Sequence, residues 1–127
     1  MKEPLDTPEE FFVVQRAKSF TYAVRGIWLL MKTTPNAWVH MVFFSIALGL
    51  GFYFGITKTE WILLILAGGF VLTAEAFNTA FEIDINLTSP NYHPYAKDTK
   101  DVAAGAVLIS AITALIIGIL IFVPYVV

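Results

Sequence analysis

Two glutamates, Glu75 and Glu82, stand one heptad apart in a stretch of the chain that is otherwise apolar. Between them lie an amide and a hydroxyl, Asn78 and Thr79, within the sequence E-A-F-N-T-A-F-E. On a helix, positions three, four and seven residues after Glu75 return to the same face, so the four side chains form one polar stripe. Ionised carboxylates at membrane depth are costly and rare, and each one is a functional-site hypothesis. The stripe is therefore the first candidate site.

Such a stripe has the groups that phosphoryl transfer at a membrane requires. One of the two carboxylates, near a lipid hydroxyl, can act as a general base. The other, nearer the cytoplasm, can hold Mg²⁺ that carries nucleotide phosphates, because Mg²⁺ prefers one or two carboxylates together with phosphate oxygens. Asn86 continues the stripe eleven residues after Glu75, whereas Asp84 points the other way and is given no role. The polar segment that follows adds four candidate groups: His93, Lys97, Lys100 and Asp101.

Other interpretations of these residues stay open on this pattern alone. Polar side chains in transmembrane helices often serve only to hold helices together. Ionisable residues at membrane depth also mark proton or ion pathways. His93 is equally consistent with a surface histidine, and Lys97 and Lys100 with the positive-inside signature of a cytoplasmic loop.

The composition is typical of a membrane protein. Of the 127 residues, 57% are hydrophobic and only 14% are charged, whereas soluble domains carry about 25% charged residues. The net charge of −2 argues against a general nucleic-acid binder. The absence of cysteine excludes disulfides, thiolate metal sites and a thiol nucleophile. We expect one all-α integral membrane domain over residues 1–127.

Apolar periodicity and helix breakers predict an N-terminal surface helix followed by three transmembrane helices. Residues 1–10 are acidic and contain prolines, so we expect a flexible tail. Residues 11–33 predict an amphipathic helix in the headgroup plane, with a helix of a soluble bundle as the alternative. The remaining expected elements are spans at 38–56, 61–84 and 101–123 and a polar loop at 86–100.

The basic residues predict the orientation in the membrane. Seven of the eight lie before the first span or between the second and third, and only Lys58 lies between the first two. Because basic loops stay in the cytoplasm, we expect a cytoplasmic N-terminus, a cytoplasmic 86–100 loop and an external C-terminus. His40 is the only ionisable residue of the first span, and the pattern assigns it no chemical role.

These motifs resemble the bacterial integral-membrane diacylglycerol kinase and undecaprenol kinase family over nearly the whole chain from Arg16. The shared segments are S-F-T-Y-A-V-R-G at 19–26, P-N-A-W-V-H at 35–40, E-A-F-N-T-A-F-E at 75–82 and Y-H-P-Y-A-K-D-T-K-D-V-A-A-G-A-V-L at 92–108. The last two, in this order and at this separation, are highly specific. The H-P-x-A-K-x-x-K-D form is more similar to the undecaprenol kinase branch than to the proteobacterial diacylglycerol kinases.

The resemblance implies a homotrimeric lipid kinase of the bacterial inner membrane, with ATP and Mg²⁺ as cofactors and active sites shared between neighbouring subunits. It implies that Glu75, with Asn78, is catalytic, and that Glu82 is the metal ligand. The acceptor, undecaprenol or diacylglycerol, is expected to contact Glu75, Arg25 and Ala104. The implied nucleotide-binding positions are Tyr22, Glu82, Asn91, Tyr92, His93, Lys100 and Asp101.

Three positions depart from the family pattern. Thr34 stands where the family usually has a glutamate that acts as the second carboxylate for the metal, and Asn86 stands in place of an aspartate. Trp38 replaces a common arginine. Because two acids are lost, we expect either weaker Mg²⁺ binding or water and phosphate oxygens in the vacant coordination positions. The alternative function is therefore a catalytically silent membrane scaffold or regulator of the same fold.

Overall fold

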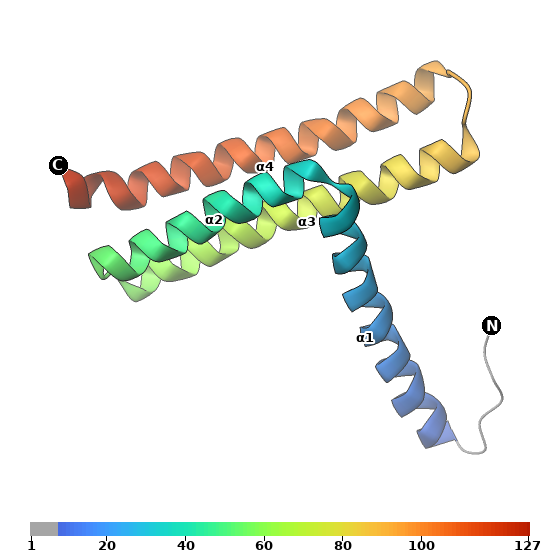
Figure 1. The fold of residues 1–127 in the computed structure, drawn as a ribbon, viewed down its shortest axis with the longest axis horizontal. Helices are drawn as coiled ribbons and strands as arrows, with labels where there is room; N and C mark the ends of the chain where they lie inside the picture. Colours follow the sequence, from blue (N-terminus) through green and yellow to red (C-terminus); the bar gives the residue numbers. More distant parts are fainter. Residues whose placement is uncertain (1–7) are drawn as a thin grey trace.

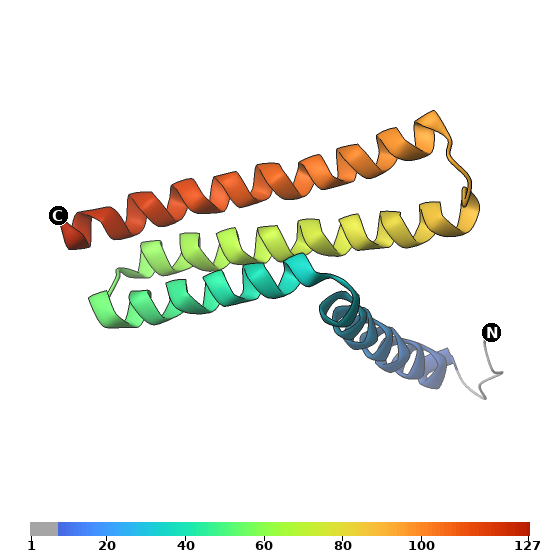
Figure 2. The same ribbon diagram turned by 45° about the horizontal axis from the view of Figure 1, so that its top comes forward.

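The computed structural model describes residues 8–127, and every regular element in that range is an α-helix. The elements are α1 (Pro8–Thr33), α2 (Pro35–Phe54), α3 (Lys58–Thr88) and α4 (Pro94–Val126). The last three lie side by side, whereas α1 leaves them at an angle (Figures 1 and 2). The predicted all-α class is confirmed. Most of the tail expected at residues 1–10 lies outside the described residues, and its last three residues begin α1.

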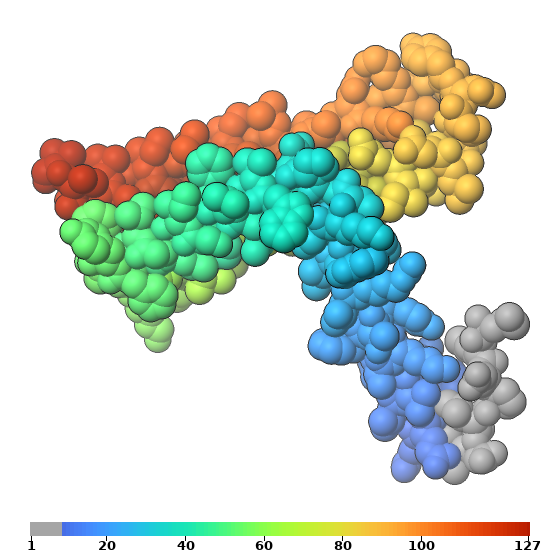
Figure 3. Space-filling model, viewed as in Figure 1, coloured from blue at the N-terminus to red at the C-terminus, as the bar shows by residue number. Residues whose placement is uncertain are grey.

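Helices α2, α3 and α4 are each long and apolar enough to cross a membrane, as predicted. Large apolar side chains point outward along them; Phe52 on α2 is 80% exposed and Leu120 on α4 is 70% exposed. Lipid tails solvate such side chains, and the helical backbone satisfies its own hydrogen bonds. The N-terminal part of helix α1 projects away from the packed helices (Figure 3), whereas its C-terminal end contacts α2 and α3. Its expected place in the headgroup layer stays a prediction.

The helices are longer than the predicted spans, and the polar loop is shorter. Helix α3 continues to Thr88 and α4 already begins at Pro94, so five residues separate them instead of the expected loop at 86–100. Proline at the first position of a helix supports that helix, because its fixed φ is helical and its missing N–H has no partner there in any case. His93 precedes it with extended backbone, and its Nδ1 accepts a hydrogen bond from the Tyr95 amide at 3.1 Å. The C-terminal helix also runs past the expected end at 123, with Pro124 inside its last turn.

The break between α1 and α2 is at Thr34, whose φ of −117° and ψ of 98° are extended. This conformation is the one expected before a proline, and Pro35 then starts α2. Across the break, the indole N–H of Trp38 donates to the Met31 carbonyl at 2.5 Å. The tryptophan that departs from the family pattern therefore links the two helices at their joint.

Close contact between α2 and α3 depends on two glycines. A Cβ atom built on Gly68 would lie 2.3 Å from the ring of Phe44, and one on Gly51 would lie 2.7 Å from the ring of Trp61. Real side chains essentially never come so close, so any larger residue there forces the rings or the helices to move. This close approach brings the side chains of α2 onto the polar stripe of α3.

Candidate active site

Glu75 lies in the middle of α3 and is fully buried. His40 of α2 is its ionisable neighbour, with Nε2 at 3.1 Å from Oε1. This contact does not have hydrogen-bond geometry, and neither carboxylate oxygen has a hydrogen-bond partner among the described residues. A buried polar group without a partner is costly, and an unsatisfied carboxylate costs more than a neutral group. The arrangement therefore suits a carboxylate whose partner comes from outside the chain.

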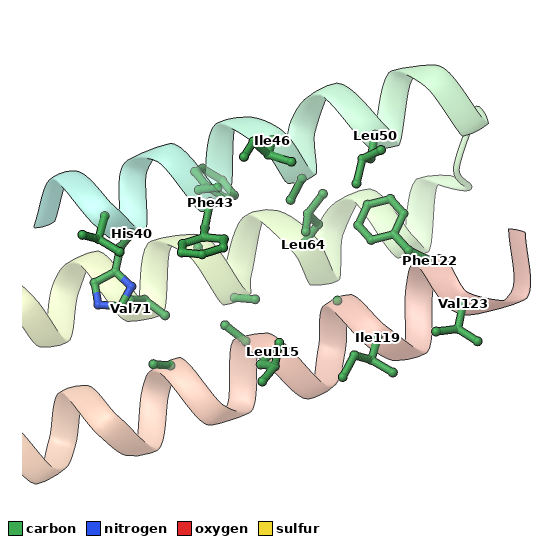
Figure 4. A pocket seen from close by; sticks show the side chains of 18 of the residues that line it. His40, Phe43, Ile46, Leu50, Leu64, Val71, Leu115, Ile119, Phe122 and Val123 are labelled. Atoms are coloured by element: carbon green, nitrogen blue, oxygen red, sulfur yellow. The ribbon is translucent and has the colours of Figure 1, made fainter. Parts of the chain in front are cut away.

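His40 also lines an apolar cavity of about 580 Å³ between α2, α3 and α4. Figure 4 shows the ring at one end of the cavity and Phe122 and Val123 toward the other. All the remaining lining side chains are apolar; they are contributed by Val39, Phe43, Phe44, Ile46, Ala47, Leu50, Leu64, Ala67, Gly68, Val71, Ala111, Ala114, Leu115, Gly118, Ile119, Phe122, Val123 and Val126. His40 was not among the predicted site residues. Its position in the first predicted span could have indicated a role, because an ionisable group at membrane depth is itself a functional hypothesis.

One helical turn beyond Glu75, Thr79 is also buried and meets Thr34. Their hydroxyl oxygens are 2.7 Å apart, so one hydroxyl donates to the other. Thr34 therefore does occupy the edge of the stripe, where the resemblance places a carboxylate, but it contributes a neutral hydrogen bond. At this position, a hydrogen bond between α2 and α3 stands in place of the metal-binding carboxylate that the resemblance implies.

At the end of the stripe, the Lys100 ammonium of α4 donates to the Asn86 side-chain oxygen of α3 at 2.7 Å. An amide carries no charge, so the contact orients the lysine without neutralising it. One turn earlier, Lys97 forms an ion pair with Asp101 at 2.5 Å. Both of these side chains are more than half exposed, and such surface pairs contribute little to stability. Lys100 is thus the better placed cation for a phosphate group.

Glu82 is exposed and makes no hydrogen bond or ion pair with the residues described here, while Asn78 is partly exposed on the same stripe. Within residues 8–127, no group of three His, Asp or Glu side chains could hold a metal ion by itself. One free carboxylate nevertheless fits Mg²⁺ bound to a nucleotide, because phosphate oxygens and water complete its octahedron. The residues suit a metal that arrives with ATP.

The remaining predicted site residues form none of the contacts described above for the stripe. Tyr22 and Arg25 are exposed on α1, and Ala104 is exposed on α4. Asn91 and Tyr92 are exposed in the short connection before α4. His93 caps α4, and its ring lies 5.5 Å from that of Tyr95. Their roles as nucleotide or lipid contacts stay predictions.

The family of this chain follows from its similarity to known proteins. A family model described as prokaryotic diacylglycerol kinase matches residues 21–122, which include α2, α3 and most of α4. The chain belongs to this family. The matched range includes the Glu75 to Glu82 stripe and the Lys97 to Asp101 segment, and it leaves out the start of α1.

Individual members of the prokaryotic diacylglycerol kinase family are similar over most of the chain. An undecaprenol kinase of Bacillus subtilis is 40% identical over 107 residues, covering 84% of this chain and 87% of the relative. A diacylglycerol kinase of Synechocystis is 35% identical over 101 residues, covering 79% of this chain and 58% of the relative. A diacylglycerol kinase of Helicobacter pylori is 27% identical over 110 residues, covering 81% and 86%.

Proposed function

We propose that this protein transfers the γ-phosphate of ATP to the hydroxyl of a membrane lipid alcohol, undecaprenol or diacylglycerol. The chain is a lipid kinase by its family and by the names of its relatives. Membership in this family favours an enzyme over a catalytically silent scaffold, the alternative based on Thr34 and Asn86 in place of acidic residues. The single structural observation that carries the mechanism is the fully buried carboxylate of Glu75, which has no hydrogen-bond partner among the described residues and contacts His40 at the end of an apolar cavity.

Glu75 is the proposed general base. An alcohol that reaches it can donate its O–H to a carboxylate oxygen that lacks a partner within the described chain. This hydrogen bond orients the lipid oxygen for attack and removes its proton as the bond to phosphorus forms.

The apolar cavity is the proposed place for the hydrocarbon chain of the acceptor. His40, which contacts Glu75, lies at one end of it, and the remaining lining is apolar over α2, α3 and α4. A lipid that extends along the helices then presents its hydroxyl at the polar end. Arg25 and Ala104 stay proposed acceptor contacts by family position only.

We propose that the nucleotide also binds at this polar end of the bundle. Lys100, held by the neutral Asn86 amide, is a point charge for a phosphate. Glu82 is the proposed ligand for Mg²⁺, which when bound offsets the charge of the phosphates. Asn78 lies between base and metal ligand along the stripe. Tyr22, Asn91, Tyr92, His93 and Asp101 complete the proposed nucleotide contacts.

The active form is proposed to be a homotrimer in the bacterial cytoplasmic membrane, with the α3–α4 connection and the N-terminus in the cytoplasm. A second apolar cavity of about 340 Å³ supports a covering neighbour, because the amide of Asn78 lines it together with Phe77 and Phe81. An amide on an open lipid-facing surface is costly. A subunit packed there shields it, and size measurement of the purified protein in detergent tests the assembly.

The proposed activity is tested with purified protein, γ-labelled ATP and mixed micelles that contain undecaprenol or diacylglycerol. We expect labelled lipid phosphate with at least one acceptor, lost when Mg²⁺ is chelated. If a folded, trimeric protein gives no product with either lipid, the proposal is wrong, and the result supports the alternative of a catalytically silent scaffold. Ion flux in liposomes without nucleotide would instead support the pathway alternative.

A further inference from the structure

We propose that His40 accepts the proton that Glu75 takes from the lipid alcohol and passes it out of the buried site. This inference rests on the proposed kinase activity and adds a residue to it. His40 acts through Glu75 and is a positioning and proton-accepting partner, not a group that touches the transferred phosphate.

The need for such a partner follows from the burial of Glu75. A base must lose its proton before the next turnover, yet this carboxylate is fully buried and no hydroxyl, amide or water-facing group of the described chain bonds to it. His40 Nε2, at 3.1 Å from Oε1, is the one basic group in contact with it. A small rotation of either side chain gives hydrogen-bond alignment at this distance.

His40 also has a route outward that Glu75 lacks. Its side chain is 22% exposed. It lies five residues after the first residue of α2, which is about 7.5 Å along the helix axis and thus close to the expected headgroup boundary. Histidine suits the task because its imidazole ring can both accept and donate a proton.

Among the described residues, Glu75 is the one charged group that forms an ion-pair contact with His40. The side chains that line the cavity with His40, from α2, α3 and α4, are all apolar. Helix α1 contributes none of this lining. Among the side chains that line the cavity, the imidazole is therefore the one that can accept a proton from Glu75.

The step balances in protons and bonds. In the transfer, the O–H bond of the alcohol breaks, its oxygen bonds to the γ-phosphorus, and the bond from that phosphorus to the bridging oxygen of ADP breaks. The proton goes to Glu75, then to Nε2 of neutral His40, which becomes a cation beside the restored carboxylate. Loss of a proton from this cation to the aqueous side returns the starting state.

The proposal predicts that the first turnover and later turnovers respond differently to loss of the imidazole. In His40→Gln, Glu75 is still present to take the proton of the alcohol in the first turnover, so rapid mixing with ATP is expected to give a burst of about one lipid phosphate per site at a rate near wild type. Later turnovers are expected to slow by about 10- to 100-fold, within the range for proton-transfer catalysis. A structural role alone slows both phases equally.

Imidazole in the buffer provides the second readout. His40→Ala opens space beside the 580 Å³ cavity, so added imidazole is expected to restore later turnovers of this variant in proportion to its concentration and to leave the burst unchanged. Ser45→Ala is the matched control, since the Ser45 hydroxyl bonds only to the Met41 carbonyl of its own helix. This control is expected to show wild-type kinetics with no response to imidazole.

Failure of this inference is distinguishable from failure of the kinase assignment. If wild type phosphorylates lipid and His40→Gln loses both phases equally, or neither, the proton-accepting role is wrong while the kinase stands. If wild type phosphorylates no lipid, both are wrong. Should His40→Ala not fold, the burst measurement on His40→Gln, whose side chain is similar in size, decides the question.

Discussion

Two acidic residues of α3, Glu60 and Glu75, show how differently the two ends of this bundle use a carboxylate. Glu60, in the first turn, accepts hydrogen bonds from the Tyr125 hydroxyl at 2.8 and 3.0 Å. Glu75, four turns later, has no hydrogen-bond partner among the described residues and touches only His40 as an ionisable group. The Glu60 carboxylate thus has its hydrogen-bond donor within the fold, whereas the Glu75 carboxylate is the one that we propose binds the lipid alcohol.

The surrounding packing follows the same division. Around Tyr125, the Phe54 ring stacks at 5.7 Å, and Ile56, Leu64 and Ile121 form the core cluster. This end joins α2, α3 and α4 through direct apolar contact. At the other end, polar contacts such as Asn86 to Lys100 link α3 and α4 near an exposed Glu82. One end therefore holds the bundle together, and the other is the proposed place of the phosphate chemistry.

The largest expected effect comes from exchanging the unpartnered carboxylate for its neutral isostere. Glu75→Gln is expected to lower lipid phosphorylation by about 10²- to 10⁴-fold, because an amide cannot accept the proton of the alcohol. Initial rates with labelled ATP check this. Glu60→Gln, the matched change at the other end, is expected to keep near wild-type rates. Equal loss in the two variants would contradict the division between the ends.

A smaller effect is expected from the cation at the nucleotide end. Lys100→Met keeps much of the side-chain volume but removes the charge that we propose binds the phosphates. We expect the KM for ATP to rise by about tenfold, the equivalent of about 1.4 kcal/mol, with a smaller change in the KM for lipid. Lys97→Met is the control, because Lys97 is already paired with Asp101. A larger effect from Lys97 would reassign the phosphate contact.

A narrower change tests the missing metal carboxylate. Thr34→Glu places an acid beside Thr79, between Glu75 and Glu82 on the stripe. If the added oxygens reach the metal, the Mg²⁺ concentration for half-maximal activity is expected to fall by several-fold. Thr34→Val, which removes only the hydroxyl contact, is the control and is expected to leave that concentration unchanged. An unaltered Mg²⁺ dependence in Thr34→Glu would show that other groups complete the coordination.

The smallest effect on activity is expected at the apolar end. Tyr125→Phe removes the hydroxyl that bonds to Glu60 and keeps the ring that stacks on Phe54. The apparent melting temperature in detergent is expected to fall by a few degrees, because a partly buried carboxylate loses its donor. Turnover per folded enzyme is expected to stay at the wild-type value. A loss of turnover with unchanged melting would mean that this end takes part in catalysis.

The sequence by itself determined the local features of this protein. Three apolar stretches long enough to cross a bilayer follow from composition, and the stripe from Glu75 to Glu82 follows from helical periodicity. Both depend only on residues close together in the chain. The motifs at 75–82 and 92–108 likewise indicated the family that the comparisons then showed. Only the ends of elements were misplaced, since Pro94 starts a helix where a longer loop was expected.

The tertiary structure decided which distant residues meet, because helix pairing depends on how whole surfaces pack. The Gly68 and Phe44 contact sets the approach of α2 to α3, and this approach places His40 against Glu75. The same packing pairs Thr34 with Thr79, 45 residues away in the chain. The spacing of residues in the sequence predicts which side chains share a face of one helix, but not which other helix packs against that face. The partner of Glu75 lies on another helix, so its identity appeared only once the helices were packed.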